Sequence, residues 1–202
     1  MSRQRERLGR DYFQRLYAAD ADPWDFATSP YEQRKYEATL AAVGRGHGNA
    51  LEIGCSIGVF TRRLAVRCRH LLAVDIAETA LTAARQRNRW QYNVEFRQME
   101  LPDELPPGRF DLIVLSEVGY YWTLPDLDRF LDWLRTGLTP GGRFVLVHWT
   151  GRTNYPLTGD QVHDHVVAAA GVHLRPTLGT VDPNYRLDVL ARTFHDATAT
   201  LA

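Results

Sequence analysis

A loop that contains two glycines, together with a later acidic residue, is the part of the sequence best suited to chemistry. In LEIGCSIGVFTRRLA, Glu52, Gly54, Ser56 and Gly58 stand where an apolar run gives way to a helical pattern. Glycines at such a point allow the backbone to approach a ligand closely. Asp75 ends the next apolar run, where a carboxylate can accept hydrogen bonds from the two hydroxyls of a ribose. The loop and the acid together predict a site for a nucleotide-like cofactor.

Two cofactors compete for this site. Nicotinamide dinucleotides favour a G-x-G-x-x-G loop, which holds a pyrophosphate at the helix N-terminus. The spacing here is Gly54-x-Ser56-x-Gly58, and Glu52 would place a negative charge beside the diphosphate. An acid at this position suits a cationic ligand instead, such as the ammonium and sulfonium of S-adenosylmethionine. We therefore expect S-adenosylmethionine, with a nicotinamide-dependent reductase as the alternative.

Candidates for proton transfer follow two later apolar runs. Glu117 and Tyr120 stand in SEVGYYW, and His148 stands in VHW. Side chains at the carboxyl ends of parallel strands border the crevice in which ligands bind. A histidine with an ordinary pKa near ~6.5 is mostly neutral at pH 7, which suits a proton acceptor. We assign catalytic roles to these three residues; for His148, a hydrogen-bonded histidine at a strand end is the alternative.

The elements that must position these residues alternate between short apolar runs and helical patterns, which is typical of an α/β fold. Strands are expected at 50–53, 70–76, 94–98, 110–116 and 143–149, and helices at 58–68, 77–90, 125–138 and 158–170. Gly141 and Gly142 are expected to end the third helix. Residues 172–194 surround the turn sequence VDPN and predict a hairpin. The predicted fold is a Rossmann-like three-layer sandwich, whose mostly parallel seven-stranded sheet is closed by a C-terminal antiparallel hairpin.

The segment before the first strand predicts a helix and a lid. In TSPYEQRKYEATLAAV, Ser29 is the expected N-cap, Pro30 the first helical residue and Glu32 the partner in a capping box. Upstream, Trp24 and Phe26 lie among turn formers and either face the substrate or pack the N-terminal helix. We expect one domain over 1–202, with N-terminal helices and a lid in 1–47 and the Rossmann-like core in 48–202.

Bulk composition limits the classes of partner. The 202 residues include 24 basic and 24 acidic side chains, and the sequence pI is about 7.1, so no global field favours nucleic acid or an anionic membrane. Cys55 and Cys68 are read as free thiols in a reducing cytosol, and no signal peptide or 18-residue apolar run appears. We expect a cytoplasmic monomer or homodimer that acts on a small molecule.

The stretch NYPLTGDQVHDH raises the question of a metal site, because it concentrates histidines and aspartates. His163 and His165 would point about 200° apart on a helix, whereas helical ligand pairs are three or four residues apart. Thr158 as N-cap and Gln161 as its capping-box partner explain the stretch locally. We expect no metal, and take Tyr155 and His163 as possible substrate contacts.

Several motifs resemble the class I S-adenosylmethionine-dependent methyltransferases. The sequence EIGCSIG is similar to the E/D-x-G-x-G-x-G motif, with Ser56 at the middle glycine, and VDIA, FDLIVLSE and LTPGGRFVLV resemble later motifs over about residues 48–149. A closer resemblance, through DPWDF, TSPYE, KYEATL, FDLIVLSEVGYYW and VHW, is to the nodulation N-methyltransferase family. Members of that family methylate the free amine of a deacetylated amino sugar. Amino-directed DNA methyltransferases carry the sequence N/D-P-P-Y/F where this chain has SEVGYY. This difference disfavours a nucleic acid as the methyl acceptor.

The resemblance implies roles for individual residues. It places Gly54, Ser56 and Gly58 around the methionine part, with Glu52 and the Ser116 carbonyl near its amino group. It places Asp75 at the ribose, Ile76, Met99 and Leu101 around the adenine and Glu100 at the adenine amino group, with Trp24 and Tyr31 as covers. Tyr121 and Trp149 would stack against the acceptor. The expected activity is N-methylation of a free amine on an amino sugar or related natural product; the alternatives are O-methylation of a natural-product hydroxyl and a non-catalytic S-adenosylmethionine-binding module.

Overall fold

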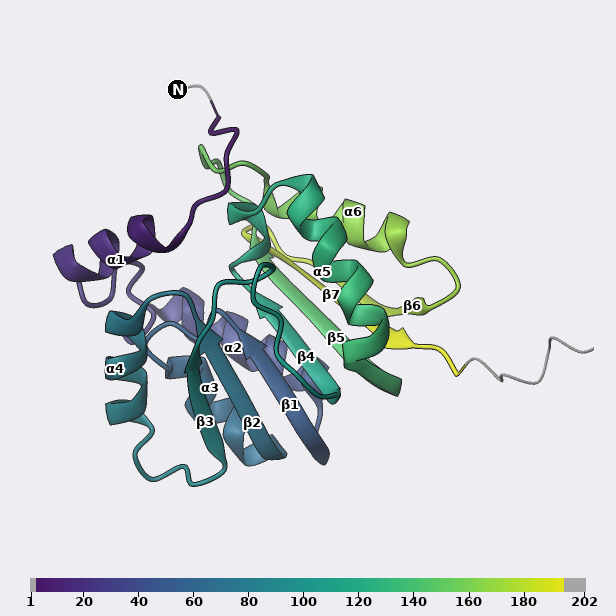
Figure 1. The fold of residues 1–202 in the computed structure, drawn as a ribbon, viewed down its shortest axis with the longest axis horizontal. Helices are drawn as coiled ribbons and strands as arrows, with labels where there is room; N and C mark the ends of the chain where they lie inside the picture. Colours follow the sequence, from purple (N-terminus) through teal and green to yellow (C-terminus); the bar gives the residue numbers. More distant parts are fainter. Residues whose placement is uncertain (1–2, 195–202) are drawn as a thin grey trace, which may run out of the picture.

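Residues 3–194 are described by the computed structural model, which forms helices and strands in alternation (Figure 1). The elements are α1 (Arg10–Ala19), α2 (Pro30–Val43), β1 (His47–Ile53), α3 (Val59–Leu64), the 3-10 turn η1 (Ala65–Arg67), β2 (Cys68–Asp75), α4 (Glu78–Arg87), β3 (Val94–Gln98), β4 (Phe110–Ser116), η2 (Gly119–Tyr121), α5 (Leu124–Gly137), β5 (Leu138–Trp149), α6 (Gly159–Ala169), β6 (Leu174–Val181) and β7 (Tyr185–Arg192).

Seven strands form one sheet in the order β3-β2-β1-β4-β5-β7-β6. Neighbouring strands from β3 to β5 are parallel, whereas β7 runs antiparallel to both β5 and β6. The strand order reverses between β1 and β4, and ligands bind beside the carboxyl ends of strands at such a switch point. The predicted mostly parallel sheet with a closing antiparallel hairpin is confirmed.

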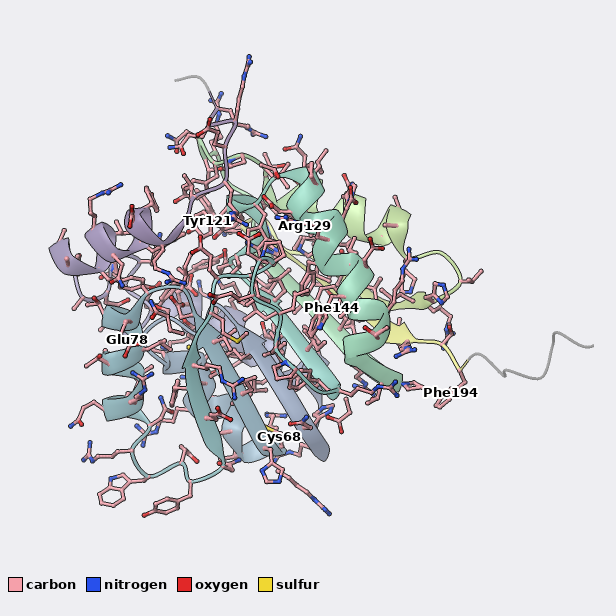
Figure 2. All side chains as sticks on the ribbon, viewed as in Figure 1. Cys68, Glu78, Tyr121, Arg129, Phe144 and Phe194 are labelled. Carbon is pink, nitrogen blue, oxygen red and sulfur yellow. The ribbon has the colours of Figure 1, made fainter. Side chains whose placement is uncertain are left out.

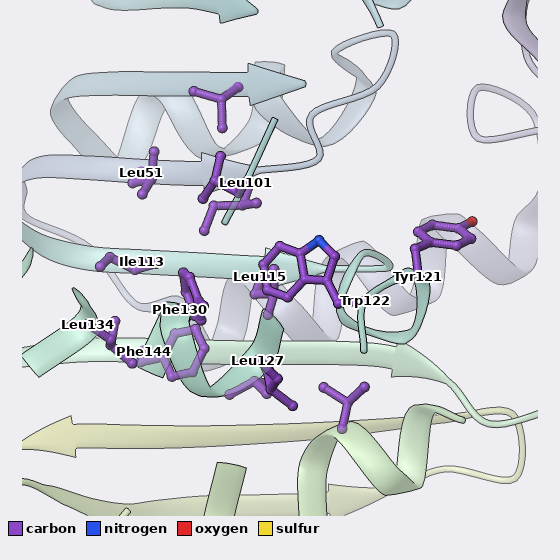
Figure 3. Close-up of a cluster of buried hydrophobic side chains, with 14 of the residues drawn as sticks. Leu51, Leu101, Ile113, Leu115, Tyr121, Trp122, Leu127, Phe130, Leu134 and Phe144 are labelled. Carbon is purple, nitrogen blue, oxygen red and sulfur yellow. The ribbon is translucent and has the colours of Figure 1, made fainter. Parts of the chain in front are cut away.

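Helices cover both faces of the sheet because successive strand residues point to opposite sides. Leu112 and Val114 of β4 pack in the cluster that contains α2 and α3, whereas Ile113 packs with Phe130 and Phe144 on the other side. Figure 3 shows this second cluster, and Figure 1 shows α5 and α6 in front of the sheet with α2 behind it. The alternation produces the three layers.

The two largest errors in the predicted boundaries are at α3 and β5. The helix expected at 58–68 ends at Leu64 and continues only as a 3-10 turn. β5 begins at Leu138 rather than at residue 143, so Gly141 and Gly142 lie inside the strand. The pairing with β4 jumps there from Leu138 to Arg143, and the extra residues are accommodated at this register shift.

One capping box was predicted correctly and the other was not. The Thr158 hydroxyl accepts from the Gln161 amide, and the Gln161 side chain accepts from the Thr158 amide. The Ser29 hydroxyl accepts from the Glu32 amide at 3.4 Å, but the Glu32 carboxylate binds Lys35 at 2.8 Å. Glu32 therefore turns toward the interior instead of capping its own helix. Within residues 3–194, no helix is long and apolar enough to cross a membrane.

Candidate functional site

A cavity of about 320 Å³ lies at the carboxyl ends of the central strands. It brings together most of the predicted site residues: Trp24, Tyr31, Gly54, Ser56, Asp75, Ile76, Met99, Glu100, Leu101, Ser116, Glu117, Tyr120, Tyr121, Trp149 and Tyr155. Figure 2 shows Tyr121 at this end of the sheet, below the N-terminal segment, with Cys68 and Phe194 toward the other end. Glu52, Gly58, His148 and His163 do not line it.

The loop after β1 is shaped by backbone conformations that few residues adopt. Gly54 has φ +79°, and a Cβ built on it would lie 2.2 Å from Cγ2 of Val118. Ser56 also has a positive φ, 49°, which costs a non-glycine residue some strain. A Cβ on Gly58 would meet Asn88 and Ala84, so Gly58 permits close packing against α4. Gly58 was predicted to lie around the methionine part of the cofactor, but it does not line the cavity. Gly54 and Ser56 are the predicted loop residues that line the cavity.

Asp75 is held by backbone amides at the end of β2. Its two carboxylate oxygens accept from the amides of Ser56 at 2.8 Å and Ala77 at 2.9 Å. Burial raises the pKa of Asp75 to about 6, against the lowering effect of these amides. Each carboxylate oxygen still has acceptor capacity, so Asp75 can receive two hydroxyls of a ligand in the cavity.

Apolar side chains and one acid border the cavity beside Asp75. Ile76, Met99 and Leu101 line this part. Glu100 lies 3.5 Å from Arg10 and 3.9 Å from Arg7, so its carboxylate faces two arginines of the N-terminal segment.

Glu52 lines a smaller pocket that adjoins the main cavity. The two pockets share Gly54, Ser56 and Ser116. Glu52 is 2% exposed, and its Oε2 has no hydrogen-bond partner among the described residues. Burial raises the pKa of Glu52 to about 8. A cationic group that entered this pocket would give the carboxylate a partner.

Lys35 joins two acids on the opposite wall. Its Nζ donates to Glu32 at 2.8 Å and to Glu117 at 2.6 Å, and Lys35 is 1% exposed. Glu117 also accepts from the Tyr120 hydroxyl at 2.5 Å and from the Trp149 amide at 3.1 Å. The carboxylate is thus fixed at the cavity wall by three kinds of donor.

Three tyrosines form an aromatic wall next to Glu117. The ring of Tyr155 stacks on Tyr120 with centroids 5.3 Å apart and meets Tyr121 edge-on at 4.6 Å. Burial raises the pKa of Tyr120 and of Tyr121 well above the ordinary value, so both phenols stay protonated at neutral pH. All three tyrosines line the cavity.

His148 is buried behind this wall, which corrects its predicted role as a proton acceptor. Its Nε2 accepts from the Gly119 amide at 3.0 Å, and its Nδ1 lies 3.1 Å from Nε2 of His163. Nδ1 of His163 lies 2.6 Å from Asp188. Burial, reinforced by His163, holds the pKa of His148 well below the ordinary value. Both ring nitrogens of each histidine are engaged, so the predicted substrate contact of His163 is also incorrect.

The N-terminal segment supplies cavity residues that the sequence analysis missed. The Tyr17 hydroxyl donates to Ser56 Oγ at 2.6 Å, and Phe13 lines the cavity from the same helix. The backbone amide of Leu8 donates to the Tyr121 carbonyl at 3.0 Å. Phe13 and Tyr17 lie four residues apart on one helix face. This spacing indicates that the face is buried, but it does not identify the part of the protein that covers it.

No group of three or more His, Cys, Asp or Glu side chains within 3–194 is arranged to hold a metal ion. His165 lies 2.6 Å from Asp128, and His163 points inward to Asp188. The two histidines diverge, as the helical spacing predicts.

Known proteins resemble the chain in sequence and in fold. The nodulation protein S of Rhizobium tropici is 32% identical over 134 residues, which are 65% of this chain and 56% of that protein; the Sinorhizobium fredii protein is 33% identical over 105 residues, 51% and 49% of the two chains. The chain thus spans about half the length of these relatives.

Solved structures share the fold. The N-methyltransferase NodS from Bradyrhizobium japonicum WM9, in complex with S-adenosyl-L-homocysteine, has a TM-score of 0.78 at 24% identity, over 90% of this chain and 97% of that one. A Pseudomonas syringae structure provisionally described as a methyltransferase has a TM-score of 0.70 at 33% identity, over 80% and 99%. A family model described as Nodulation protein S (NodS) matches residues 7–140. The chain belongs to the NodS family.

Proposed function

We propose that this protein is an S-adenosylmethionine-dependent methyltransferase that acts on a small molecule, with a free amine of an amino sugar or related natural product as the favoured acceptor. One observation carries the proposal: the Asp75 carboxylate and the Glu117–Tyr120 pair line the same cavity. The first suits the ribose of the cofactor and the second suits an acceptor. The NodS relatives support the same activity.

The residues fit this cofactor. Glu52 offers an unpaired carboxylate oxygen beside Gly54 and Ser116, where the amino group of the methionine part would lie. Asp75 offers acceptors for the ribose, and Met99 and Leu101 offer an apolar slot for the adenine. When bound, the cofactor supplies a methyl group already activated by a sulfonium.

The remaining task of the protein is to align the acceptor and to handle one proton. Orientation of two reactants contributes on the order of 7–11 kcal/mol, and a general base typically contributes about 10²–10⁴-fold. We assign orientation to the rings of Tyr120, Tyr121 and Tyr155, with Trp149 at the rim.

Proton transfer is assigned to Tyr120 and Glu117. An alkyl ammonium has an ordinary pKa near ~10.4, so an amine acceptor must lose a proton before or during attack. The Tyr120 hydroxyl donates to Glu117 Oε2 and keeps a lone pair for the acceptor. It can therefore take the proton of the acceptor as it passes its own to Glu117.

A mass-spectrometric screen tests the proposal. Purified protein and S-adenosylmethionine are incubated with amino sugars, their N-acetylated forms and phenolic acceptors. Gain of one methyl on free amines alone is the expected result. Methylation of phenols alone would reassign the protein as an O-methyltransferase, and cofactor binding without turnover on any acceptor would reassign it as a binding module.

A further inference from the structure

Glu32 is a buried acid with no assigned role. Its side chain does not cap its helix, and it takes no part in the proposed proton transfer. It is 6% exposed, it projects from α2, and its Oε2 has no hydrogen-bond partner within residues 3–194. An ionised carboxylate that is buried without a full set of partners costs several kcal/mol. A ligand that donated a hydrogen bond to Oε2 would reduce this cost.

The charges around Glu32 favour a cation as that ligand. Lys35 is the one buried lysine in the described chain, and Glu32 shares it with Glu117. Glu32 and Glu117 also line the small pocket to which Glu52 contributes its own unpaired oxygen. Three acidic side chains thus line this pocket, whereas Lys35, which pairs with two of them, does not line it.

The position of the pocket indicates which cation it takes. Gly54, Cys55, Ser56 and Ser116 line it, and these belong to the loop after β1 and to the end of β4. The tyrosines of the aromatic wall do not line it. The pocket therefore lies mainly at the cofactor loop, and it meets the proposed acceptor side through Glu117.

We infer that Glu32 is a cofactor-binding residue, whose carboxylate receives the ammonium of the methionine part from the α2 side while Glu52 faces it from β1. The inference rests on the proposed function and extends it to the N-terminal segment. An ammonium has three N–H donors, so Glu32, Glu52 and a backbone carbonyl such as that of Ser116 together satisfy it.

Burial raises the pKa of Glu32, although Lys35 opposes the effect, and burial raises that of Glu52 to about 8. Glu52 thus has no cationic partner among the described residues, and Glu32 has only Lys35, which it shares with Glu117. A bound ammonium would lower both values.

The experiment compares two ligands on matched variants by isothermal titration calorimetry. S-adenosylhomocysteine carries the ammonium, and its 3-deamino analogue differs only in lacking it. Glu32→Gln keeps the shape of the side chain and removes its charge. Glu37→Gln is the control, because Glu37 is exposed on the same helix.

Glu32→Gln is expected to weaken the binding of S-adenosylhomocysteine about 10- to 100-fold. This is the range for the loss of a hydrogen bond to a charged group. The deamino analogue should bind the wild type and Glu32→Gln within about twofold, and Glu37→Gln should match the wild type. Comparison of the two ligands on one variant removes any general loss of stability from the result.

Equal weakening of both ligands, or no weakening of either, would overturn the inference. A raised KM for the amine acceptor with unchanged affinity for S-adenosylhomocysteine would also overturn it and would move Glu32 to the acceptor side. If the wild type itself does not bind S-adenosylhomocysteine, the proposed function fails first, so the two failures are distinguishable.

Discussion

The Tyr17 hydroxyl donates a hydrogen bond to Ser56 Oγ at 2.6 Å, and this contact ties helix α1 to the loop after β1. Both residues line the cavity, and Ser56 holds a positive φ of 49°. Serine at this place, where the methyltransferase motif has a glycine, thus provides a hydroxyl that connects α1 to the loop.

Loss of the Tyr17 hydroxyl should speed release of the bound cofactor product. A typical hydrogen bond contributes about 0.5–1.5 kcal/mol, so Tyr17→Phe should raise the dissociation rate of S-adenosylhomocysteine by about 2- to 10-fold in stopped-flow measurements. Ser56→Ala should do the same, and the double variant should add little. Fully additive effects would show that the two hydroxyls act independently.

Replacement of Asp75 should remove tight cofactor binding. Each hydrogen bond from a ribose hydroxyl to a carboxylate contributes about 1.5–3 kcal/mol. Asp75→Asn should therefore lower the affinity for S-adenosylhomocysteine, measured by calorimetry, by about 100-fold or more. Asp132→Asn, on the exposed face of α5, is the control. Retained tight binding would contradict the proposed ribose site.

Cofactor binding should release a proton at neutral pH. With a pKa of about 8, Glu52 is largely protonated at pH 7 in the free protein, and an ammonium beside it would lower that pKa. The other ionisable side chains that line its pocket are Glu32, Tyr36, Cys55 and Glu117, and the charge of Asp75 also raises its pKa. Calorimetry in buffers of different ionisation enthalpy measures the release.

The release should diminish above pH 8, where Glu52 is already ionised. Glu52→Gln should remove most of it at pH 7, and so should the deamino ligand. The same raised pKa means that the folded protein holds a proton which the unfolded chain loses, so the contribution of Glu52 to the free energy of unfolding should fall as pH rises from about 4.5 to 8. A release that Glu52→Gln leaves unchanged would assign the proton to another group.

Loss of the Glu117–Tyr120 pair should affect turnover more than cofactor affinity. Tyr120→Phe removes the hydroxyl that donates to Glu117 and keeps the ring, so kcat for an amine acceptor should fall about 10²–10⁴-fold. Affinity for S-adenosylhomocysteine should change by less than about threefold. An unchanged kcat would leave Tyr120 as part of the wall only.

His148 should matter for stability and not for the shape of the pH–rate profile. His148→Phe leaves the Gly119 amide and Nε2 of His163 without partners, and each buried unpaired group costs about 1–3 kcal/mol in unfolding free energy, measured by urea denaturation. The apparent pKa values of kcat should stay unchanged. Disappearance of one ionisation from the profile would restore His148 as a proton acceptor.

The central strands and the cofactor loop were predictable because their signals are local. A continuous apolar run such as FDLIVLS fits a strand covered on both faces, and the pattern of Glu52, Gly54 and Ser56 is confined to one turn. Asp75 follows from its place at the end of the next run. Such features depend on neighbours in the chain and not on distant packing.

The errors concern residues whose partners come from far along the chain. Ser29 and Glu32 have the spacing of a capping box, but a buried pair such as Glu32 with Lys35 has the same spacing of three residues. The place of His148 at a strand end gave no sign that α6 would cover it with His163. Burial of a polar side chain is decided by tertiary contacts, which the local pattern does not report.

The hydrogen bonds from Gly119 through His148 and His163 to Asp188 all run in one direction. Asp188 accepts from His163, which fixes the protons of both rings so that His148 can accept from the Gly119 amide. That amide cannot take up a proton, so the chain cannot conduct one toward the cavity. Through Asp188, the C-terminal hairpin therefore fixes the position of Gly119 at the start of η2, and with it Tyr120. It does so without passing protons to or from the reaction.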